Sequence, residues 1–281
     1  MRSKSSLTLG DWLKDAGDRL ELAGLKSAPL EAQIIAASAL GRDRSWVVAH
    51  HSDPLPEMRS ADLALSRRLD HEPLAYILGW REFYGRRFQV NPVVLVPRQE
   101  TETLVELTLE LIPQNFVESI LDLGTGSGCI AITLKLEMPS LQVSASDISH
   151  EAIEVARANA GALSAQVEFV ESDRFSGLKS RPFDLIVSNP PYVGIEDGLP
   201  REVAEYEPKL ALYGRPLWDS FYRQIAQEAP LVLKGPRIAA VEVGDYQYER
   251  VTEIFIEEGW VLVASKSDLG GMPRAMAFRM P

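Results

Sequence analysis

The chain has 281 residues, 46% of them hydrophobic, and a formal net charge of −11; this length suits one large or two ordinary domains with a buried core. The acidic balance argues against long DNA as a partner, because polyanion-binding proteins carry a basic face, although an acidic average leaves room for a local basic patch. A single cysteine, Cys129, excludes an intrachain disulfide, and four histidines without metal-ligand spacing lead us to expect no metal.

The N-terminal stretch MRSKSSLTLGDWLKDAG has no apolar h-region of the kind found in signal peptides. No apolar run in the chain reaches the roughly 18 residues that a bilayer crossing needs. We therefore expect a soluble, intracellular protein that does not bind a membrane.

Residues 1–80 carry helical patterns at 7–24, 28–41 and 60–70. Gly41 is the expected C-cap of the second helix, and Ser60 is the expected N-cap of the third. Together the patterns predict a small helical bundle. The bundle would be either a packing appendage or a unit that recognises a partner, and the pattern leaves both interpretations open.

Residues 81–97, REFYGRRFQVNPVVLVP, alternate aromatic and β-branched side chains around Gly85 and Asn91. This pattern is typical of a β-hairpin, which we expect to link two domains.

From about residue 101 onward, apolar strand patterns alternate with helical patterns at 128–138, 149–163 and 217–233. That alternation predicts right-handed βαβ units in a doubly wound, mainly parallel sheet. The last two strands are joined by residues 266–274, which is too short for a helical crossover, so they should pair antiparallel. The seven expected strands cover 119–124, 141–147, 166–172, 183–189, 237–243, 260–265 and 275–280.

The first of these strands runs into a glycine loop with Gly124, Gly126 and Gly128. The spacing is G-x-G-x-G: the sixth position holds Cys129 rather than the glycine of a dinucleotide fingerprint, and no Lys-Ser/Thr pair of a P-loop follows. Glycines here would let the backbone turn sharply and approach a ligand closely. The alternative is a plain turn between a strand and a helix.

Two further strand ends offer carboxylates. Asp147 is suited to accept hydrogen bonds from both hydroxyls of a ribose, or it caps the following helix, where Ser149 competes for that role. Asp173 ends the next strand and could accept from an adenine amino group. Because ligands of such folds bind at the carboxyl ends of the strands, the set is more informative than any single residue.

The fourth strand ends in the sequence Asn189-Pro190-Pro191-Tyr192 and points to the same crevice. If the ligand is S-adenosylmethionine, the Asn189 side-chain carbonyl and the Pro190 main-chain carbonyl could each accept one N–H of an NH2 group. This would aim the nitrogen lone pair at the methyl group. Pro191 would stiffen the backbone, and Tyr192 would offer a flat face to a planar substrate.

This pair of motifs resembles those of S-adenosylmethionine-dependent methyltransferases that act on planar NH2 groups, namely adenine N6- and protein glutamine N5-methyltransferases. Residues 73–106 resemble the linker and first catalytic-domain helix of the release-factor glutamine methyltransferases of the HemK type. The stretches DLGTGSGCIAI, SNPPYV, EYEPKLALYG and VEVG extend the resemblance over nearly the whole chain.

The resemblance implies a class I S-adenosylmethionine-dependent methyltransferase fold, with a seven-stranded sheet ending in an antiparallel strand, behind an N-terminal helical bundle. It implies three parts: a helical substrate-recognition domain (1–80), a hairpin linker (81–97) and a catalytic domain (98–281). The substrate would be the Gly-Gly-Gln glutamine of class I peptide-chain release factors, and the cofactor product S-adenosylhomocysteine. The helical domain and hairpin would dock the factor. We expect a monomer without direct nucleic-acid binding, in a bacterial cytoplasm or an organelle.

The resemblance also assigns residues. The loop from Gly124 to Gly128 would hold the methionine moiety, Asp147 the ribose, and Asn189 to Tyr192 the target amide. The cofactor-binding set is Gly124, Thr125, Gly126, Ser127, Gly128, Asp147, Asp173, Arg174 and Asn189, and the catalytic set is Asn189, Pro190, Pro191 and Tyr192.

The chain departs from the family pattern at several positions. Gln99 replaces a proline, and Arg174 stands where many relatives carry an aromatic residue; Arg174 would either stack on adenine or lie solvated at the surface. The loop GRPLWD, at 214–219 with Arg215 and Pro216, replaces a glycine-rich turn. Glu205 and Glu207 would be capping or ion-pair residues, or would touch the substrate.

Three alternatives remain open. The chain could methylate a glutamine of a ribosomal protein or the N6 of adenine in a nucleic acid. It could also be a non-catalytic S-adenosylmethionine-binding module, although an intact NPPY sequence argues against that. The acidic-Thr-Glu sequence after the arginine of VPR favours the release-factor type, and no basic, aromatic-interleaved segment of a DNA-recognition domain is present.

Overall fold

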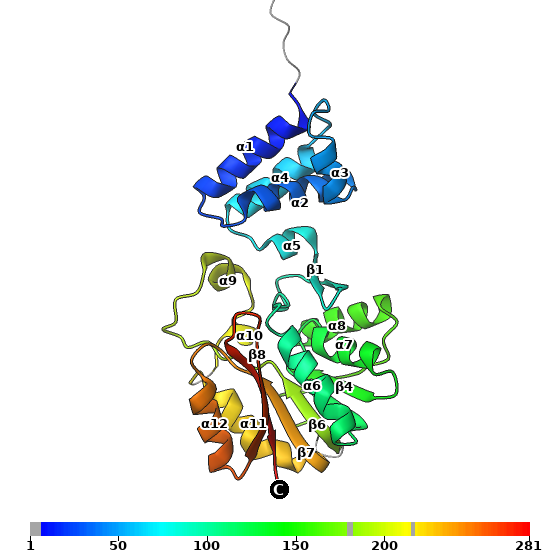
Figure 1. The fold of residues 1–281 in the computed structure, drawn as a ribbon, viewed down its shortest axis with the longest axis vertical. Coiled ribbons are helices and arrows are strands. Elements are labelled where there is room, and N and C mark those ends of the chain that lie inside the picture. The colour runs from blue at the N-terminus through cyan, green and yellow to red at the C-terminus, as the bar shows by residue number, and fades with distance from the viewer. Residues whose placement is uncertain (1–6, 179–181, 215–216) are drawn as a thin grey trace, which may run out of the picture. The chain divides into compact units, whose positions relative to one another are not determined.

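The structure is a computed structural model that describes residues 7–178, 182–214 and 217–281 (Figure 1). The chain divides into two compact units. One comprises the chain up to Gly79 together with Pro200–Tyr206, and the other comprises Trp80–Leu199 with Glu207–Pro281. Among the described residues, no helix combines the length and the apolar character that crossing a membrane would require.

The first unit is helical, as the sequence predicts. Its helices are α1 (Leu9–Leu22), α2 (Ala28–Leu40), α3 (Arg44–Ala49), α4 (Arg59–Leu69), α5 (Leu74–Leu78) and α9 (Arg201–Tyr206). Thr8 and Asp11 form a capping box that starts α1, and Gly41 ends α2 in the left-handed conformation. The core between the helices is apolar, with residues such as Leu9, Ile35 and Val47 almost fully buried.

The prediction that Ser60 caps the third helix is wrong. Helix α4 starts at Arg59, so Ser60 is its second residue, and its N-cap is Met58, which makes no side-chain capping hydrogen bond. Met58 is buried in the helical core, whereas Ser60 is exposed. Burial of the methionine therefore sets the start of this helix in place of a hydroxyl cap.

Ion pairs attach α9 to the helical unit. The guanidinium of Arg68 is buried and pairs with Glu31 of α2 at 2.6 Å and with Glu202 of α9 at 2.8 Å. The hydroxyl of Tyr206 donates to the carbonyl of Asp70 at 2.8 Å. A short segment between strands of the second unit thus belongs to the first.

The second unit begins with a hairpin of β1 (Trp80–Phe83) and β2 (Arg86–Gln89), which pair antiparallel. Tyr84 and Gly85 both have positive φ, 50° and 69°, as a two-residue turn matching the strand twist requires. The hairpin is shorter than the predicted 81–97, because residues 90–97 continue without a strand.

The sheet of the second unit has seven strands in the order β5-β4-β3-β6-β7-β9-β8. The pairs among β5, β4, β3, β6 and β7 are parallel, and β9 is antiparallel to both of its neighbours. This confirms the predicted doubly wound sheet with a reversed last strand. The bounds are β3 (Ser119–Leu123), β4 (Gln142–Asp147), β5 (Glu168–Glu171), β6 (Phe183–Ser188), β7 (Leu233–Glu242), β8 (Val261–Ser267) and β9 (Pro273–Arg279).

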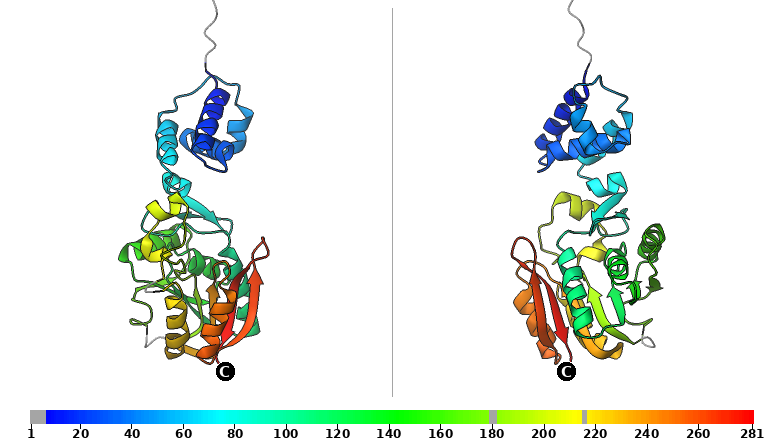
Figure 2. Two further views of the ribbon diagram at one scale, coloured as in Figure 1. Left: turned by 90° about the vertical axis from the view of Figure 1, so that its left-hand side faces the viewer. Right: turned by 45° about the vertical axis from the view of Figure 1, so that its right-hand side comes forward.

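Helices cover both faces of this sheet (Figures 1 and 2). One face packs on α6 (Glu102–Gln114), α7 (Cys129–Glu137) and α8 (His150–Ala162), and the other on α11 (Ser220–Glu228) and α12 (Tyr248–Glu257). Successive side chains of β3 point to opposite faces of the sheet. Ile120 packs in the core with α6, α7 and α8, and Leu121 packs in the core with α11 and α12. A one-turn helix, α10 (Lys209–Leu212), and a 3-10 turn (Ala229–Leu231) complete the unit.

The strand order reverses between β3 and β6, which are adjacent and parallel. From β3 the chain crosses to β4 on one side, and from β6 it crosses to β7 on the other. A crevice forms at the carboxyl ends of two such strands. The glycine loop follows β3 and the NPPY sequence follows β6, so the topology brings both motifs to one place.

Candidate active site

A cavity of about 440 Å³ lies at this switch point, entirely within the second unit. It is lined by the loops after β3, β4, β5 and β6, by Val93–Leu95 and by residues of α10 and α11. Most of the predicted site residues line it: Gly124, Thr125, Gly126, Ser127, Asp147, Asp173, Arg174, Asn189 and Pro191. Gly128, Pro190 and Tyr192 do not line it.

The three glycines differ in what they do. All have positive φ, with 76° at Gly124, 55° at Gly126 and 82° at Gly128. A Cβ added at Gly124 or Gly126 would meet no atom within 4 Å, so these two leave space beside the backbone. At Gly128 it would lie 2.8 Å from Cδ1 of Ile132 and 3.1 Å from Cβ of Ala156, so this glycine serves the packing of α7 against α8.

Asp122 lies beneath the glycine loop and is completely buried. Its Oδ2 accepts from the hydroxyl of Thr125 at 2.6 Å and from the backbone N–H of Ala131 at 3.1 Å. Its Oδ1 has no hydrogen-bond partner among the residues that the structure describes. Burial raises the pKa of Asp122 to about 7, and the two hydrogen bonds counteract part of this rise.

Asp147 faces the cavity from the end of β4. Its two oxygens accept from the backbone N–H groups of Gly126 at 2.9 Å and Ser149 at 3.0 Å. The cap of α8 is Ser149, whose hydroxyl accepts from the backbone N–H of Ala152 at 3.1 Å. Asp147 therefore positions the glycine loop, and each of its oxygens retains a lone pair for a further donor.

Asp173 and Arg174 form a bidentate ion pair at the rim of the cavity. The Arg174 Nε and Nη2 atoms donate to the two Asp173 oxygens at 2.8 and 3.1 Å. This pair fixes the plane of the guanidinium beside the cavity, an arrangement suited to stacking on a flat ring. Phe175, the aromatic residue one position on, is buried in the core and does not reach the cavity.

The side chain of Asn189 is anchored by one of its two polar atoms. Its Nδ2 donates to the hydroxyl of Thr101 at 3.2 Å, which leaves Oδ1 as an acceptor. Within the described parts of the chain, no group donates to Asn189 Oδ1 or to the carbonyl of Pro190. The two acceptors proposed from the sequence for an NH2 group are therefore not used by the protein itself.

Tyr192 is turned away from the cavity. Its hydroxyl donates to Oε1 of Glu242 at 3.2 Å, and its carbonyl accepts from Nε2 of Gln247 at 2.9 Å. Burial and the nearby Glu242 carboxylate raise the pKa of its phenol. A contact between the Tyr192 ring and the substrate thus stays a prediction, whereas its hydrogen bonds to Glu242, the last residue of β7, and to Gln247, which follows that strand, are present in the structure.

Glu207 has an ion-pair role, one of those considered from the sequence. Its carboxylate is buried and accepts from Arg98 Nη2 at 2.5 Å and from the backbone N–H of Val96 at 3.1 Å. Arg98 itself lines the cavity. Glu205 also forms an ion pair, with Arg201 at 2.9 Å, but it is exposed, lies on α9 in the helical unit and does not line the cavity.

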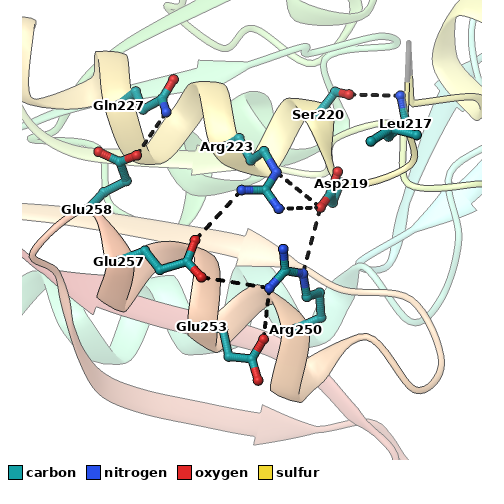
Figure 3. Close-up of polar contacts among 9 residues, drawn as sticks. All are labelled: Leu217, Asp219, Ser220, Arg223, Gln227, Arg250, Glu253, Glu257 and Glu258. Atoms are coloured by element: carbon teal, nitrogen blue, oxygen red, sulfur yellow. Dashed lines mark hydrogen bonds and ion pairs between the residues drawn. The ribbon is translucent and has the colours of Figure 1, made fainter.

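The unusual loop at 214–219 is fixed at its end by ion pairs. Asp219 is buried and accepts from Arg223 of α11 at 2.9 Å, while Arg250 of α12 lies 3.8 Å away (Figure 3). Arg250 also pairs with Glu253 at 2.8 Å. This cluster joins α11 to α12. Arg215 and Pro216 lie outside the described residues.

Several residues near the site are not in the predicted set. They are Asp122 and Glu242, which are buried beneath the loops, and Thr101, Arg98, Phe221 and Gln224, which line the cavity. Thr101 lies in the stretch VPRQETE. The resemblance of this stretch to the family is the sequence feature that could have identified Thr101 as a site residue. Phe221 and Gln224 carry the i, i+3 spacing of a helix face, which does not distinguish a cavity wall from a core.

Comparisons with known proteins agree with this architecture. The family described as "Methyltransferase small domain" matches residues 98–200, and the "PrmC N-terminal domain" matches residues 11–79. Among solved structures, the hMettl16 catalytic domain in complex with MAT2A 3'UTR hairpin 6 has a TM-score of 0.55 at 16% identity, covering 78% of this chain and 81% of that chain. The Thermus thermophilus 16S rRNA N2 G1207 methyltransferase, in complex with AdoMet and guanosine, has a TM-score of 0.51 at 17% identity and covers 72% and 51%. These likenesses concern the fold alone.

Two curated relatives match over nearly the full length of both chains. The release factor glutamine methyltransferase of Koribacter versatilis is 40% identical over 98% of this chain and 99% of its own length, and that of Neisseria gonorrhoeae is 40% identical over 95% and 96%. A bifunctional methyltransferase of Rickettsia bellii is 36% identical over 92% of this chain, which spans 52% of that protein. With the fold, the cavity and these full-length matches together, the chain belongs to the release factor glutamine methyltransferase family.

Proposed function

We propose that this enzyme transfers the methyl group of S-adenosylmethionine to the side-chain nitrogen, N5, of the glutamine in the Gly-Gly-Gln motif of class I peptide-chain release factors. The products are N5-methylglutamine and S-adenosylhomocysteine. The observation that carries the proposal is Asn189, which lines the same cavity as the glycine loop and whose Oδ1 is uncommitted, in a chain whose full-length relatives bear that name. Within the described residues, the carbonyl of the adjoining Pro190 is the second uncommitted acceptor.

The two acceptors suit the chemistry of an amide. The nitrogen of a glutamine side chain is a poor nucleophile because its lone pair is delocalised into the carbonyl. Acceptors that bind both N–H bonds orient the nitrogen toward the methyl group and stabilise the positive charge that develops on it. Proline fixes its own φ and restricts the residue before it, so Pro190 and Pro191 limit the motion of both acceptors.

The cavity also fits the cofactor. Open space beside Gly124 and Gly126 and the Asp147 carboxylate at the end of β4 provide room for the ligand and an acceptor for its hydroxyl groups. In this proposal the loop from Gly124 to Gly128 holds the methionine moiety, Asp147 the ribose, and Asp173 and Arg174 the adenine. When bound, the cofactor supplies an electrophilic methyl group on a sulfonium.

The finer assignments belong to the same proposal. The helical domain (1–80) and the hairpin linker (81–97) would dock the release factor, and residues 98–281 would carry catalysis. The separate match of residues 11–79 to a family of its own supports this division. We propose that the enzyme acts as a monomer in the cytoplasm. Within the described residues, no group of three or more potential metal ligands is present.

The test is methyl transfer from labelled S-adenosylmethionine to a purified class I release factor. The expected result is label in the intact factor and none in a factor whose Gly-Gly-Gln glutamine is replaced by alanine. Parallel reactions contain ribosomal proteins or an adenine-containing oligonucleotide, which represent the alternative substrates. Label that persists after the glutamine is replaced, or that appears in the oligonucleotide instead, would overturn the proposal.

A further inference from the structure

Asn159 is a buried polar residue of α8 whose side chain bonds two separate segments of the second unit. Only 1% of it is exposed. Its Oδ1 accepts from the backbone N–H of Gln89 at 2.7 Å, and its Nδ2 donates to the carbonyls of Gln89 at 3.0 Å and of Ser127 at 2.8 Å. Both N–H bonds of the amide are therefore used, and three hydrogen bonds compensate for the burial of this polar group.

The first segment is the glycine loop after β3. Ser127 lines the cavity, and the next residue, Gly128, packs on Ala156 of α8, where an added Cβ would lie 3.1 Å from that of Ala156. Ala156 and Asn159 are three residues apart and so lie on one face of the helix. This face of α8 therefore contacts the loop at two successive residues, by a hydrogen bond at Ser127 and by packing at Gly128.

The second segment runs from the end of the hairpin to the cavity. Gln89 is the last residue of β2, and both of its backbone groups bond Asn159. A turn follows, in which the Oδ1 and the carbonyl of Asn91 accept from backbone N–H groups of residues 93–95 at 3.0 and 3.1 Å. Residues 93–95 line the cavity. Asn159 thus holds the start of a short segment that ends as a second wall of the same cavity.

We propose that Asn159 is a positioning residue that couples two walls of the cavity, the glycine loop and residues 93–95. The inference rests on the proposed function, because it takes the glycine loop as the binding site of S-adenosylmethionine. Asn159 does not itself line the cavity, so it acts through the two segments that it bonds.

The coupling follows from the use of one planar amide for both bonds. A ligand that restricts Ser127 also restricts Asn159, and Asn159 in turn restricts Gln89. The second wall is then ordered before the methyl acceptor arrives, and an acceptor that contacts this wall loses less conformational entropy on binding. A residue that only stabilised the fold would not make the mobility of Gln89 depend on the cofactor site.

Amide hydrogen exchange, measured by NMR, tests the coupling without any methyl acceptor. The probe is the backbone N–H of Gln89, followed in the free enzyme and at saturating S-adenosylhomocysteine. In the parent, we expect the bound ligand to slow this exchange about 5- to 50-fold. The backbone N–H of Gly270 is the reference, since it also bonds a side chain, that of Asp268 at 2.9 Å, but lies outside the cavity. Its exchange should change by less than about twofold.

Asn159→Ala should abolish the response of Gln89, so that exchange with and without the ligand agrees within about twofold. Asn159→Ser is a second variant, which answers the same question if the alanine variant does not fold. Its hydroxyl has one proton and cannot donate to the carbonyls of both Gln89 and Ser127, so we expect it to lose the response as well.

Arg86→Ala is the matched control. Arg86 also attaches the hairpin to a helix, because its Nη2 donates to Glu137 of α7 at 2.6 Å, but it makes no hydrogen bond with the glycine loop. We expect the ligand to slow exchange of Gln89 in this variant as much as in the parent. The dissociation constant of S-adenosylhomocysteine, measured by calorimetry, should rise about 5- to 50-fold in Asn159→Ala and stay within about twofold of the parent value in Arg86→Ala.

The outcomes separate this inference from the proposed function. A parent that binds S-adenosylhomocysteine without slower exchange at Gln89 would overturn the inference alone. The same holds if the Asn159 variants keep the full response, or if Arg86→Ala loses it equally. A parent that does not bind the ligand would contradict the proposed cofactor and the inference with it. A parent that shows the response but does not methylate release factor would contradict only the proposed substrate.

Discussion

Asn189 is held at the cavity by Thr101, whose hydroxyl accepts from its Nδ2 at 3.2 Å and leaves Oδ1 as an acceptor. Thr101 precedes α6 and lies 88 residues away in sequence. The position of Asn189 after a buried strand and before two prolines predicts an acceptor at the crevice, but this local pattern does not identify the distant partner that orients it.

Replacing Asn189 by alanine tests the amide-orienting role at this scale. We expect kcat to fall by at least about 10²-fold, because one of the two acceptors is removed from the transition state. The dissociation constant of S-adenosylmethionine should change by no more than about threefold, because the glycine loop and Asp147 are untouched. Steady-state kinetics with calorimetric cofactor binding measures both quantities.

Asn115→Ala, at the end of α6 and outside the cavity, is the control for the removal of an asparagine. A variant at Asn189 with near-normal turnover would refute the orienting role. A parallel loss of cofactor binding would instead assign the residue to the cofactor.

Among the elements, strands are most readily predicted where an apolar run is bounded by turn residues, as in β3 and β6, which are buried along their whole length. Helices α9 and α10 have six and four residues, too few for a periodic pattern to appear. Helix α12 was also not predicted, although its sequence does carry a periodic pattern: Val251, Ile254 and Phe255 have the spacing of one helix face. The prediction of an N-cap at Ser60 is wrong because burial of Met58 outweighs the hydrogen bond that a hydroxyl cap would make.

Gly128 allows a test of how closely α7 packs against α8. Gly128→Ala should lower the free energy of unfolding by more than Gly259→Ala, measured by denaturant titration without cofactor. Both residues have positive φ, 82° and 85°, so each alanine costs about 1–2 kcal/mol in backbone strain. Only the Cβ at Gly128 also meets close neighbours, Ile132 and Ala156, whereas Gly259 has none within 4 Å. Equal losses in the two variants would show that the packing of α7 against α8 tolerates the added methyl group.

Asp184 supplies a second prediction about elements. Its Oδ2 accepts from the backbone N–H groups of Glu118 and Ser119 and from the Ser119 hydroxyl, at 2.8–3.0 Å, and so joins the start of β6 to β3. Asp184→Ala should lower the free energy of unfolding by about 2–4 kcal/mol, because it leaves the two buried donors of Ser119 without an acceptor. Asp184→Asn, which keeps an acceptor oxygen, should lose clearly less. Denaturant titration distinguishes the two, and identical losses would contradict the role of these hydrogen bonds.

The whole molecule is acidic and divides into two compact units. A net charge of −11 does not favour a polyanionic substrate, which agrees with a protein as the methyl acceptor. The sequence predicts two units from a change of pattern near residue 80, and the boundary of the helical unit lies at Gly79. It could not predict that Pro200–Tyr206 belongs to that unit, because the ion pair of Glu202 with Arg68 spans 134 positions.

Two buried carboxyls make stability depend on pH. The pKa values of Asp122 and Glu242 are both raised to about 7, from ordinary values of 3.8 and 4.5. The folded protein therefore holds protons that the unfolded chain releases, so the free energy of unfolding should fall as pH rises from about 4 to 7. Asp122→Asn and Glu242→Gln should each make this fall shallower. Denaturant titration of the second unit across this range checks the slope, and a stability that rises over the same interval would contradict the buried, protonated state of both groups.

The central claim is that the methyl group is transferred to a glutamine side chain held by Asn189 and Pro190. The most direct measurement is tandem mass spectrometry of a class I release factor after incubation with the enzyme and S-adenosylmethionine. We expect one added methyl group, confined to the peptide with the Gly-Gly-Gln motif and located on its glutamine side chain, and no such group with Asn189→Ala. A methyl group on another residue, or an unmodified glutamine in the presence of active enzyme and cofactor, would contradict it.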